Sequence, residues 1–500
     1  MILKMNLVPL FIIIPLAGAF IIPIFGKRIK PFGSLMAVLT TLSSAALSIF
    51  TLLAVSAQKV LVYNVGGWPA PFGISVVVDG LAVFMLVTVN IIAFLVALFS
   101  IDYIRKYTDT WKFYTLFILM LSGMNGVLIA GDLFNLYIFL EVSAIAGYSL
   151  VAFGTKAEEL EASFKYAVMG AVASSFILIG IAILYSYTST LNMADMALLL
   201  AAKGASGVIP FVSVLFLMGF GLKGSLVPFH AWLPDAHTSA PTPISAMLSG
   251  VLIKVLGVYS LLRIFFNVLG VSDKVLSIFM FLGAISIMAG VLLAVGQWDF
   301  KRLLAYHSIS QIGYIMLGVG LGSPVGIFGG LFHLFNHSIF KSLLFLNSGA
   351  IDYSIRTRNL KEMGGLSQIM PVTANTSLIA SMSIAGIPPL NGFFSKLIII
   401  LACVQANRLG YAFWAVAGSL LTLASFMKVQ RYAFFGVLNE KWKNAKEVPL
   451  TMKAPMIILA AICVIAGLLA TPACSSFIRS AAEVLSKGKE YASLIAGVIK

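Results

Sequence analysis

The sequence is poor in charged residues. Acidic and basic side chains make up 10% of its 500 residues and apolar side chains 60%, whereas soluble proteins average about 25% charged residues. A water-soluble fold of this length could not hide so much apolar surface. Apolar runs of roughly 18 to 25 residues recur along the chain, long enough to cross a hydrocarbon core of about 30 Å. We therefore expect a polytopic membrane protein.

Cysteine and long polar loops are also scarce. Cys403, Cys463 and Cys474 form no CxxC pair and lie in or beside late apolar runs, which argues against iron–sulfur ligation, structural zinc and a disulfide framework. No connection is longer than roughly 25 residues, so a soluble catalytic domain does not fit. We expect no cofactor, metal, redox centre or hydrolytic centre on this chain, and any redox cofactor should belong to another subunit.

The net charge of +15 is informative through its distribution. Short basic clusters separate the apolar runs: Lys27, Arg28 and Lys30; Arg105, Lys106 and Lys112; Lys301 and Arg302; Arg356, Arg358 and Lys361; and a late cluster from Lys428 to Lys453. Clusters in alternate connections are typical of loops on the cytoplasmic side, whereas a nucleic-acid site would gather its charge on one soluble face. We predict a multi-pass protein of the cell inner or plasma membrane, with its N-terminus outside and no nucleic-acid partner.

The apolar runs predict about fourteen membrane spans in an all-α fold. The expected spans lie near residues 6–25, 33–57, 76–101, 113–130, 133–153, 166–187, 207–233, 243–266, 275–296, 303–321, 325–350, 371–402, 410–432 and 455–473. The first run is too long for the apolar core of a signal peptide, so we interpret it as a spanning helix. The tail after Thr471 mixes charged and apolar residues and is compatible with an interfacial helix.

Five ionisable residues lie well inside these apolar spans: Glu141, Lys223, Lys254, Lys341 and Lys396. A charged side chain near the bilayer centre costs about 2.5–3.5 kcal/mol on insertion scales, so its presence needs a reason. A single lysine can extend to the interface and play a structural role, but five such residues indicate an ion pathway. A carboxylate beside a buried lysine would let that amine gain and lose a proton as the two groups approach and separate.

Histidine falls only in the central part of the sequence, at His230, His237, His307, His333 and His337. His333, His337 and Lys341 are spaced four residues apart and therefore share one helix face. No cysteine or acidic ligand accompanies them, so a proton relay or a polar helix contact is favoured over a metal site. His230 and His237 flank Pro234, where structural and functional roles are both open.

Helix-breaking residues accompany two of the lysines. Gly219, Gly221, Gly224 and Pro228 lie around or just after Lys223, and Pro388 and Pro389 precede Lys396. Although the three glycines match GxGxxG, no strand precedes them, so a dinucleotide site lacks its required context. Paired interruptions in two halves of a membrane protein indicate inverted repeats with an ion site between them.

Three stretches resemble the antiporter-like subunits of respiratory complex I. They are residues 223–243 (KGSLVPFHAWLPDAHTSAPTP), 301–314 (KRLLAYHSISQIGY) and 386–389 (GIPP). The same family includes subunits of Mrp-type cation/proton antiporters and of energy-converting membrane-bound hydrogenases. The resemblance extends from about Asp79 to about Phe435.

The resemblance implies fourteen helices with two inverted five-helix repeats and broken helices in spans 7 and 12. The corresponding division is residues 1–110 for spans 1–3, 111–270 for the first repeat, 271–435 for the second, and 436–500 for span 14 and the tail. By match of motif, Glu141 is similar to the carboxylate of span 5, Lys223 to its partner lysine, and Lys254 to the connecting residue of span 8. Lys341, with His333 and His337, falls at the polar positions of span 11, and Lys396 is similar to the terminal lysine of span 12, where some relatives carry Glu.

The function implied is proton translocation within a redox-driven pumping complex of the membrane-bound hydrogenase or complex I type. Partner subunits would then include further antiporter-like membrane subunits and peripheral redox subunits holding iron–sulfur clusters with nickel–iron or flavin. The alternative is an Mrp-type sodium/proton antiporter subunit without redox chemistry. Na⁺ is the alternative cargo, but a row of lysines carries only protons, so the pathway predicted here favours H⁺.

Overall fold

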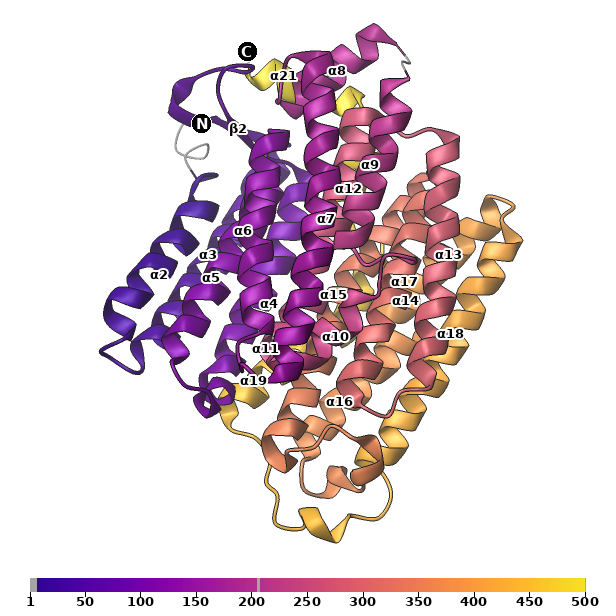
Figure 1. Cartoon of the computed structure of the whole chain (residues 1–500). Helices are drawn as coiled ribbons and strands as arrows, with labels where there is room; N and C mark the ends of the chain where they lie inside the picture. Colours follow the sequence, from indigo (N-terminus) through magenta and orange to yellow (C-terminus); the bar gives the residue numbers. More distant parts are fainter. Residues whose placement is uncertain (1–6, 205–206, 500) are drawn as a thin grey trace.

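The structure is a computed structural model that describes residues 7–204 and 207–499, and it consists mostly of long helices (Figure 1). The first half contains α2 (Leu10–Gly26), α3 (Phe32–Gln58), α4 (Gly80–Tyr103), α5 (Thr110–Ile129), α6 (Leu133–Val151), α7 (Ala157–Thr188), α8 (Met193–Lys203), α9 (Val208–Lys223) and α10 (Trp232–Ser239). A central helix, Thr242–Leu269, is continuous, includes α11 (Thr242–Met247) and α12 (Ser260–Leu262), and has three π-helical stretches.

The second half continues with α13 (Asp273–Val295), α14 (Phe300–Gly320), α15 (Pro324–Ile355), α16 (Pro371–Ala385), α17 (Asn391–Gln405), α18 (Leu409–Val429), α19 (Leu450–Ile465), α20 (Ser476–Ser486) and α21 (Glu490–Ile499). Several helices begin where a polar side chain accepts a hydrogen bond from the first turn, as Asp79, Asp132 and Asp299 do. Such caps satisfy backbone groups that a membrane would leave without partners.

Nine helices in the described part of the chain are long and apolar enough to cross a membrane, and Leu10–Gly26, Val208–Lys223 and Asn391–Gln405 are shorter apolar helices. The chain is therefore a multi-pass helical membrane protein. α14 and α15 lie outside both groups, because polar side chains interrupt their apolar runs: His307, Ser308 and Gln311 in α14, and His333, His337 and Lys341 in α15.

The two ends of the helices differ. One end, which we call the hairpin face, carries α8, α21 and the antiparallel strands β1 (Leu61–Asn64) and β2 (Ser75–Val78), which Figure 1 shows at the top. The other end, the basic face, carries connections 27–31, 104–109 and 356–370. The expected third span began at residue 76; that start is wrong, because Val76–Val78 pair with β1 and the helix begins at Gly80.

Small residues let neighbouring helices approach closely. A Cβ on Gly283 of α13 would lie 2.8 Å from the carbonyl oxygen of Gly313 on α14, and a Cβ on Gly313 would lie 2.5 Å from that of Gly283. Membrane helices use such glycines because close van der Waals packing replaces the hydrophobic effect between them. α13 and α14 consequently form one of the tightest helix pairs of the second half.

The centre of the molecule is formed by the helix Thr242–Leu269 and by α15. Every residue in the most apolar window of the central helix is buried, and α15 packs against α14, α16, α17 and α19. Residues 326–351 of α15 are buried almost without exception. Ionisable side chains on these two helices are thereby kept away from lipid.

The C-terminal tail packs against the helix ends. Ile478, Ala481 and Leu485 form the buried side of α20, which contacts α4 and α15. Asn267, near the end of the central helix, donates hydrogen bonds to the carbonyl oxygens of Val484 at 2.8 Å and Gly488 at 3.2 Å. The tail is thus tied to the central helix, which its amphipathic sequence alone did not reveal.

Two isolated β-bridges, each between segments far apart in the sequence, have the same arrangement. Asp132 pairs with Asn192 and Asp299 pairs with Asn359, each in antiparallel fashion. Both partners of the second bridge lie 167 positions after their counterparts in the first (132 to 299, 192 to 359). The first bridge joins the start of α6 to the start of α8, on the hairpin face, and the second joins the start of α14 to the α15–α16 connection, on the basic face.

Candidate functional site

The break after α9 positions the first predicted pair. α9 ends at Lys223, whose Nζ lies 3.3 Å from Oε1 of Glu141 on α6. Only 2% of the Lys223 side chain is exposed, but 25% of the Glu141 side chain is. The hydroxyl of Ser174, on α7, donates a hydrogen bond to the same Glu141 oxygen. The structure therefore unites the two ionisable groups that sequence reasoning paired.

Hydrogen bonds to a backbone carbonyl group stabilise this interruption of the helix. Helix geometry stops after Lys223 and resumes at Trp232. The indole of Trp232 donates to the carbonyl oxygen of Leu222 at 3.0 Å. The same oxygen accepts from the backbone N–H of Ser225 at 3.1 Å, so this carbonyl at the helix end has two partners. Pro228 lies in the non-helical segment.

Two of the predicted helix-breaking glycines do not break the helix. Gly219 and Gly221 lie inside α9, and a Cβ on Gly219 would lie 2.6 Å from Cγ1 of Ile177 and 2.9 Å from the carbonyl oxygen of Ala173 on α7. Gly219 therefore permits close packing of α9 against α7. Gly224, in contrast, marks the end of the helix and lies against Gly257 of the central helix.

The Gly224–Gly257 contact yields a stability prediction. A Cβ on Gly257 would meet Cα of Gly224 at 2.2 Å, so Gly257→Ala should force the break away from the central helix and lower the free energy of unfolding by about 1–3 kcal/mol. Gly410→Ala is the control, because nothing lies within 4 Å of a Cβ there. Thermal unfolding of the two purified variants measures the difference, and equal midpoints would contradict the prediction.

Lys254 lies at the start of a π-helical stretch, Lys254–Tyr259, and is completely buried. Its amine donates to the carbonyl oxygens of Ser249 at 2.5 Å and Gly250 at 2.7 Å. Insertion of an extra residue into a helix turn often marks a functional site. Here the widened turns surround an amine whose hydrogen-bond partners, among the described residues, are backbone oxygens alone.

A short polar network connects Lys254 with Lys341. The hydroxyls of Ser249 and Ser308 lie 2.7 Å apart, and Ser308 donates to the carbonyl oxygen of Leu304 at 3.2 Å. The amine of Lys341 donates to the same carbonyl oxygen. Lys254 contacts the backbone carbonyl of Ser249, whose hydroxyl contacts Ser308, so Ser249, Ser308 and Leu304 lie between the two amines where the central helix, α14 and α15 meet.

The histidines of α15 extend this polar core. His333 and His337 are fully buried, with ring centroids 6.4 Å apart. The two ring nitrogens of His333 lie 3.0 Å from Oγ of Ser395 and 3.1 Å from Oε1 of Gln311. In the part of the chain that the structure describes, neither ring nitrogen of His337 has a hydrogen-bond partner. The two rings share one face of α15, as the four-residue spacing predicted, and His333 contacts both α14 and α17.

The second break positions Lys396. Helix geometry stops after Ala385 and resumes at Asn391, so Pro388 and Pro389 lie between two half-helices. The amine of Lys396 donates to the carbonyl oxygen of Ile384 at 2.7 Å, across the break. It also lies 3.3 Å from Oγ of Ser419 and 4.7 Å from the centroid of the Tyr314 ring.

The remaining histidines differ in setting. His230 is partly exposed beside the first break, whereas His237 and His307 are fully buried. Nε2 of His307 lies 2.8 Å from Oγ of Ser425. Among the described residues, no group of three or more His, Cys, Asp and Glu side chains is arranged to hold a metal ion.

Sequence reasoning missed the hydroxyl and carbonyl groups that join the ionisable residues. Ser174, Ser249, Ser308, Ser395 and Ser419 all contact members of the pathway or its network. Serine is common in membrane helices, so composition gives no sign of which hydroxyls face an ion path. The one available signal was the run of polar residues in 307–311, where His307, Ser308, Ser310 and Gln311 interrupt an otherwise apolar helix.

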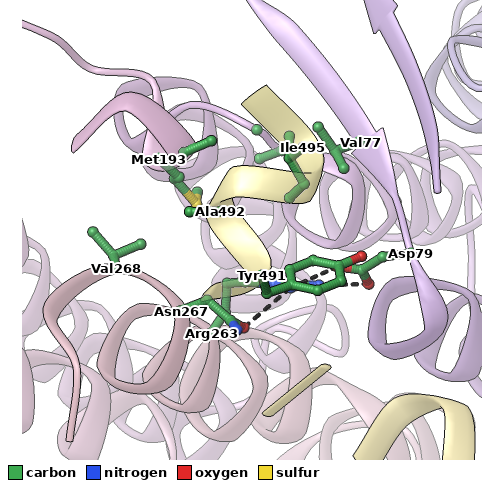
Figure 2. A pocket seen from close by; sticks show the side chains of 12 residues that line it. Val77, Asp79, Met193, Arg263, Asn267, Val268, Tyr491, Ala492 and Ile495 are labelled. Carbon is green, nitrogen blue, oxygen red and sulfur yellow. Dashed lines mark hydrogen bonds and ion pairs between the residues drawn. The ribbon is translucent and has the colours of Figure 1, made fainter. Parts of the chain in front are cut away.

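A buried ion pair lies farther along the central helix, toward the hairpin face. Nη1 of Arg263 lies 2.7 Å from Oδ2 of Asp79, with 9% and 1% of their side chains exposed. Figure 2 shows this pair beside Tyr491 and Asn267, at a cavity of about 30 Å³ lined partly by α21. The pair connects the start of α4 with the central helix and lies beneath the tail.

Two family models match the chain. The first, described as NADH:quinone oxidoreductase/Mrp antiporter, TM, matches residues 130–422. The second, described as NADH-ubiquinone oxidoreductase (complex I), chain 5 N-terminus, matches residues 64–114. Together they extend over the region in which the sequence motifs occur.

Similar proteins come from both branches of that family. A Na⁺/H⁺ antiporter subunit from Alkalihalophilus pseudofirmus is 36% identical over 96% of this chain and 97% of its own. An NADH-quinone oxidoreductase subunit from Desulforudis audaxviator is 34% identical over 92% of this chain and 95% of its own. A chain in the structure of an Mrp complex from Dietzia sp. DQ12-45-1b superposes with a TM-score of 0.92 at 27% identity, with full coverage of both chains.

Proposed function

This chain belongs to the NADH:quinone oxidoreductase/Mrp antiporter family, and we propose that it translocates protons as a membrane subunit of a larger ion-pumping complex. The observation that carries the proposal is the row of buried amines. Lys254 and Lys341 contact the backbone carbonyls of Ser249 and Leu304, between which the Ser249 and Ser308 hydroxyls lie, and Lys223 pairs with Glu141. Membrane proteins retain such costly groups where ions move.

The Glu141–Lys223 pair acts as a charge switch in this proposal. While the carboxylate is near, it stabilises the protonated amine; when it withdraws, the buried charge loses its counter-charge and the amine releases its proton. Lys254, Lys341, His337, His333 and Lys396 receive and pass on that proton. Lysine amines bind protons and not Na⁺, because they have no oxygen ligand to offer.

The architecture that accompanies this function is fourteen crossings with two inverted five-helix repeats. The matching bridges support it, because the same construction recurs after 167 residues on the opposite face. The two broken helices, α9–α10 and α16–α17, provide a second correspondence. With the basic face in the cytoplasm, the N-terminus lies outside the cell.

Glu141 also indicates a partner. One quarter of its side chain is exposed in the middle of α6, where lipid would otherwise meet a carboxylate at a cost of about 2.5–3.5 kcal/mol. We therefore place another membrane subunit of the same complex against this side of α6. A charge on this partner that moves toward or away from Glu141 would weaken or restore its attraction to Lys223. The partner would thereby separate the Glu141–Lys223 pair.

Lys341→Met tests the transport assignment. Loss of the amine should reduce ion-coupled turnover of the assembled complex by about 100-fold, the scale of a lost proton-transfer group. Lys361→Met, on an exposed part of the basic face, is the matched control. Proton movement is measured with a pH-sensitive dye in vesicles that hold the complex, and full pumping by Lys341→Met would rule the pathway out.

The complex itself has two candidate identities. A redox-driven pump is favoured by the NADH-quinone oxidoreductase relative, whereas an Mrp-type sodium/proton antiporter is favoured by the higher identity to the Na⁺/H⁺ antiporter relative and by the Mrp structure. A chain in the structure of a membrane-bound sulfane sulfur reductase, a respiratory membrane complex, also superposes on this one, with a TM-score of 0.89 at 29% identity. On this support we propose a redox-driven complex, with iron–sulfur clusters and nickel–iron or flavin in partner subunits. Metal analysis and the absorbance spectrum of the purified complex decide between the two, because an Mrp-type complex should contain none of these cofactors.

A further inference from the structure

A polar vestibule opens on the basic face. It has a volume of about 1300 Å³ and lies among the ends of α4, α10, α14 and α15 and the α6–α7 connection. Charged residues of both signs line it, including Asp102, Glu159, Asp352, Lys106 and Arg358. Such a lining holds water and exchanges protons with the solution.

Lys301 forms part of the vestibule wall but is itself only 2% exposed. Its amine donates to the carbonyl oxygen of Ala240 at 2.5 Å. Among the described residues, it forms no ion pair within 4.0 Å with an acidic side chain. A buried amine between a hydrated space and the protein interior is placed to take up and release protons.

His237 lies on the inner side of this contact. The ring is fully buried, and within residues 7–204 and 207–499 neither ring nitrogen has a hydrogen-bond partner. Ser245 donates to the carbonyl oxygens of both His237 and Ala240, at 2.8 and 3.3 Å, which fixes the histidine beside the acceptor of Lys301. The His237 ring centroid lies 5.6 Å from that of Phe345, and the Lys341 amine lies 5.7 Å from the same Phe345 centroid.

We propose that Lys301 and His237 form the proton inlet that joins this vestibule to Lys254 and Lys341. A hydronium ion in the vestibule protonates the Lys301 amine, which passes one proton to a ring nitrogen of His237. The ring releases a proton from its other nitrogen toward the central lysines and returns to the neutral form. This inference rests on the proposed function and adds the side and the residues of entry.

The substitutions Lys301→Arg and Lys301→Met distinguish a proton-relay role of Lys301 from a purely structural role. Arginine keeps the positive charge and the hydrogen-bond donors but does not release a proton. If Lys301 is part of the proton inlet, the ion-coupled turnover of both variants should fall by about tenfold or more, because a proton-transfer group has been removed. Full turnover of Lys301→Arg with loss in Lys301→Met would show that Lys301 serves only as a structural charge, and would overturn the inlet.

His237→Phe keeps an aromatic ring against Phe345, whose centroid lies 5.6 Å away, and removes both nitrogens. We expect about a tenfold loss of turnover and a larger solvent deuterium isotope effect than in the unmodified complex, since proton uptake becomes limiting. Unchanged turnover would overturn the inlet. Lys341→Met, measured in the same assay, distinguishes a failure of the inlet proposal from a failure of the proposed function. If Lys341→Met also pumps fully, the proposed function itself is wrong.

Access to the vestibule can be measured without transport. In a Cys474→Ser background, Ser239→Cys places a thiol on the vestibule wall, while Cys403 and Cys463 stay buried. A charged, membrane-impermeant thiol reagent should label the assembled complex from the basic face and not from the hairpin face. Labelling from neither face would show that no hydrated entrance exists there, and labelling from the hairpin face would place it on the wrong side.

Discussion

Replacing Glu141 by glutamine is expected to lower ion-coupled turnover by about 100-fold or more. Glutamine keeps the size of the side chain and can still accept the hydrogen bond of Ser174, but it removes the charge that lies 3.3 Å from Lys223. The amine then has no counter-charge to hold its proton, so the pair cannot cycle between loaded and released states. Turnover is measured on complexes shown by co-purification to be fully assembled.

Glu161→Gln is the matched control for this variant. Glu161 lies on the adjacent helix α7, is 66% exposed, and pairs with Lys165 at 2.7 Å. Exposed pairs of this kind contribute about 0–1 kcal/mol, so its loss should leave turnover unchanged. Coupled pumping at the normal rate by Glu141→Gln would eliminate the charge switch, whereas a loss in both variants would indicate that α6 and α7 tolerate no change in charge.

The ionisable residues could be predicted from sequence because they are exceptions. A lysine such as Lys254 or Lys396 stands out within an apolar run, and the cost of burying it makes a role in ion movement the simplest explanation. The position of the second helix break was predictable for a related reason, since the adjacent Pro388 and Pro389 disfavour a continuous helix. The structure places both lysines inside the molecule.

The groups that connect these residues could not be predicted. Lys341 donates to a backbone carbonyl, that of Leu304, and every residue has such a group. The π-helical turns around Lys254 depend on packing in the fully buried central helix and have no signature in composition. Gly219 was misassigned to a break for the same reason: whether a glycine interrupts a helix or lets another helix approach is decided by its neighbours.

The short β-strands were missed because their composition is that of a membrane helix. Val76, Val77 and Val78 continue directly into the apolar run of α4, so hydropathy extended the third span through them. β-Branched residues favour strands, and Asp79 caps the following helix by accepting a hydrogen bond from Ala82 at 2.8 Å. Together these two signals locate the boundary that hydropathy alone did not.

Asp79→Ala is expected to destabilise the protein strongly. The change leaves Arg263 buried without its carboxylate partner, and breaking a buried pair in this way costs about 3–5 kcal/mol. It also removes the cap of α4, worth about 1 kcal/mol. Unfolding is measured by the reaction of a thiol dye with the buried Cys403 and Cys463 in a Cys474→Ser background, as temperature rises.

Two further variants assign the loss to its cause. Asp79→Asn keeps a side-chain oxygen for the cap and removes only the charge, so it should account for most of the effect. Asp109→Asn breaks a pair of similar length with Lys112, 2.7 Å, whose side chains are 56% and 53% exposed, and should cost no more than about 1 kcal/mol; asparagine tolerates the left-handed backbone at this position, φ 52°. If Asp79→Asn and Asp109→Asn unfold at the same temperature, the Arg263–Asp79 pair contributes nothing beyond an exposed one. A selective loss in Asp79→Asn instead means that this ion pair fixes the central helix, and with it Lys254, against the start of α4.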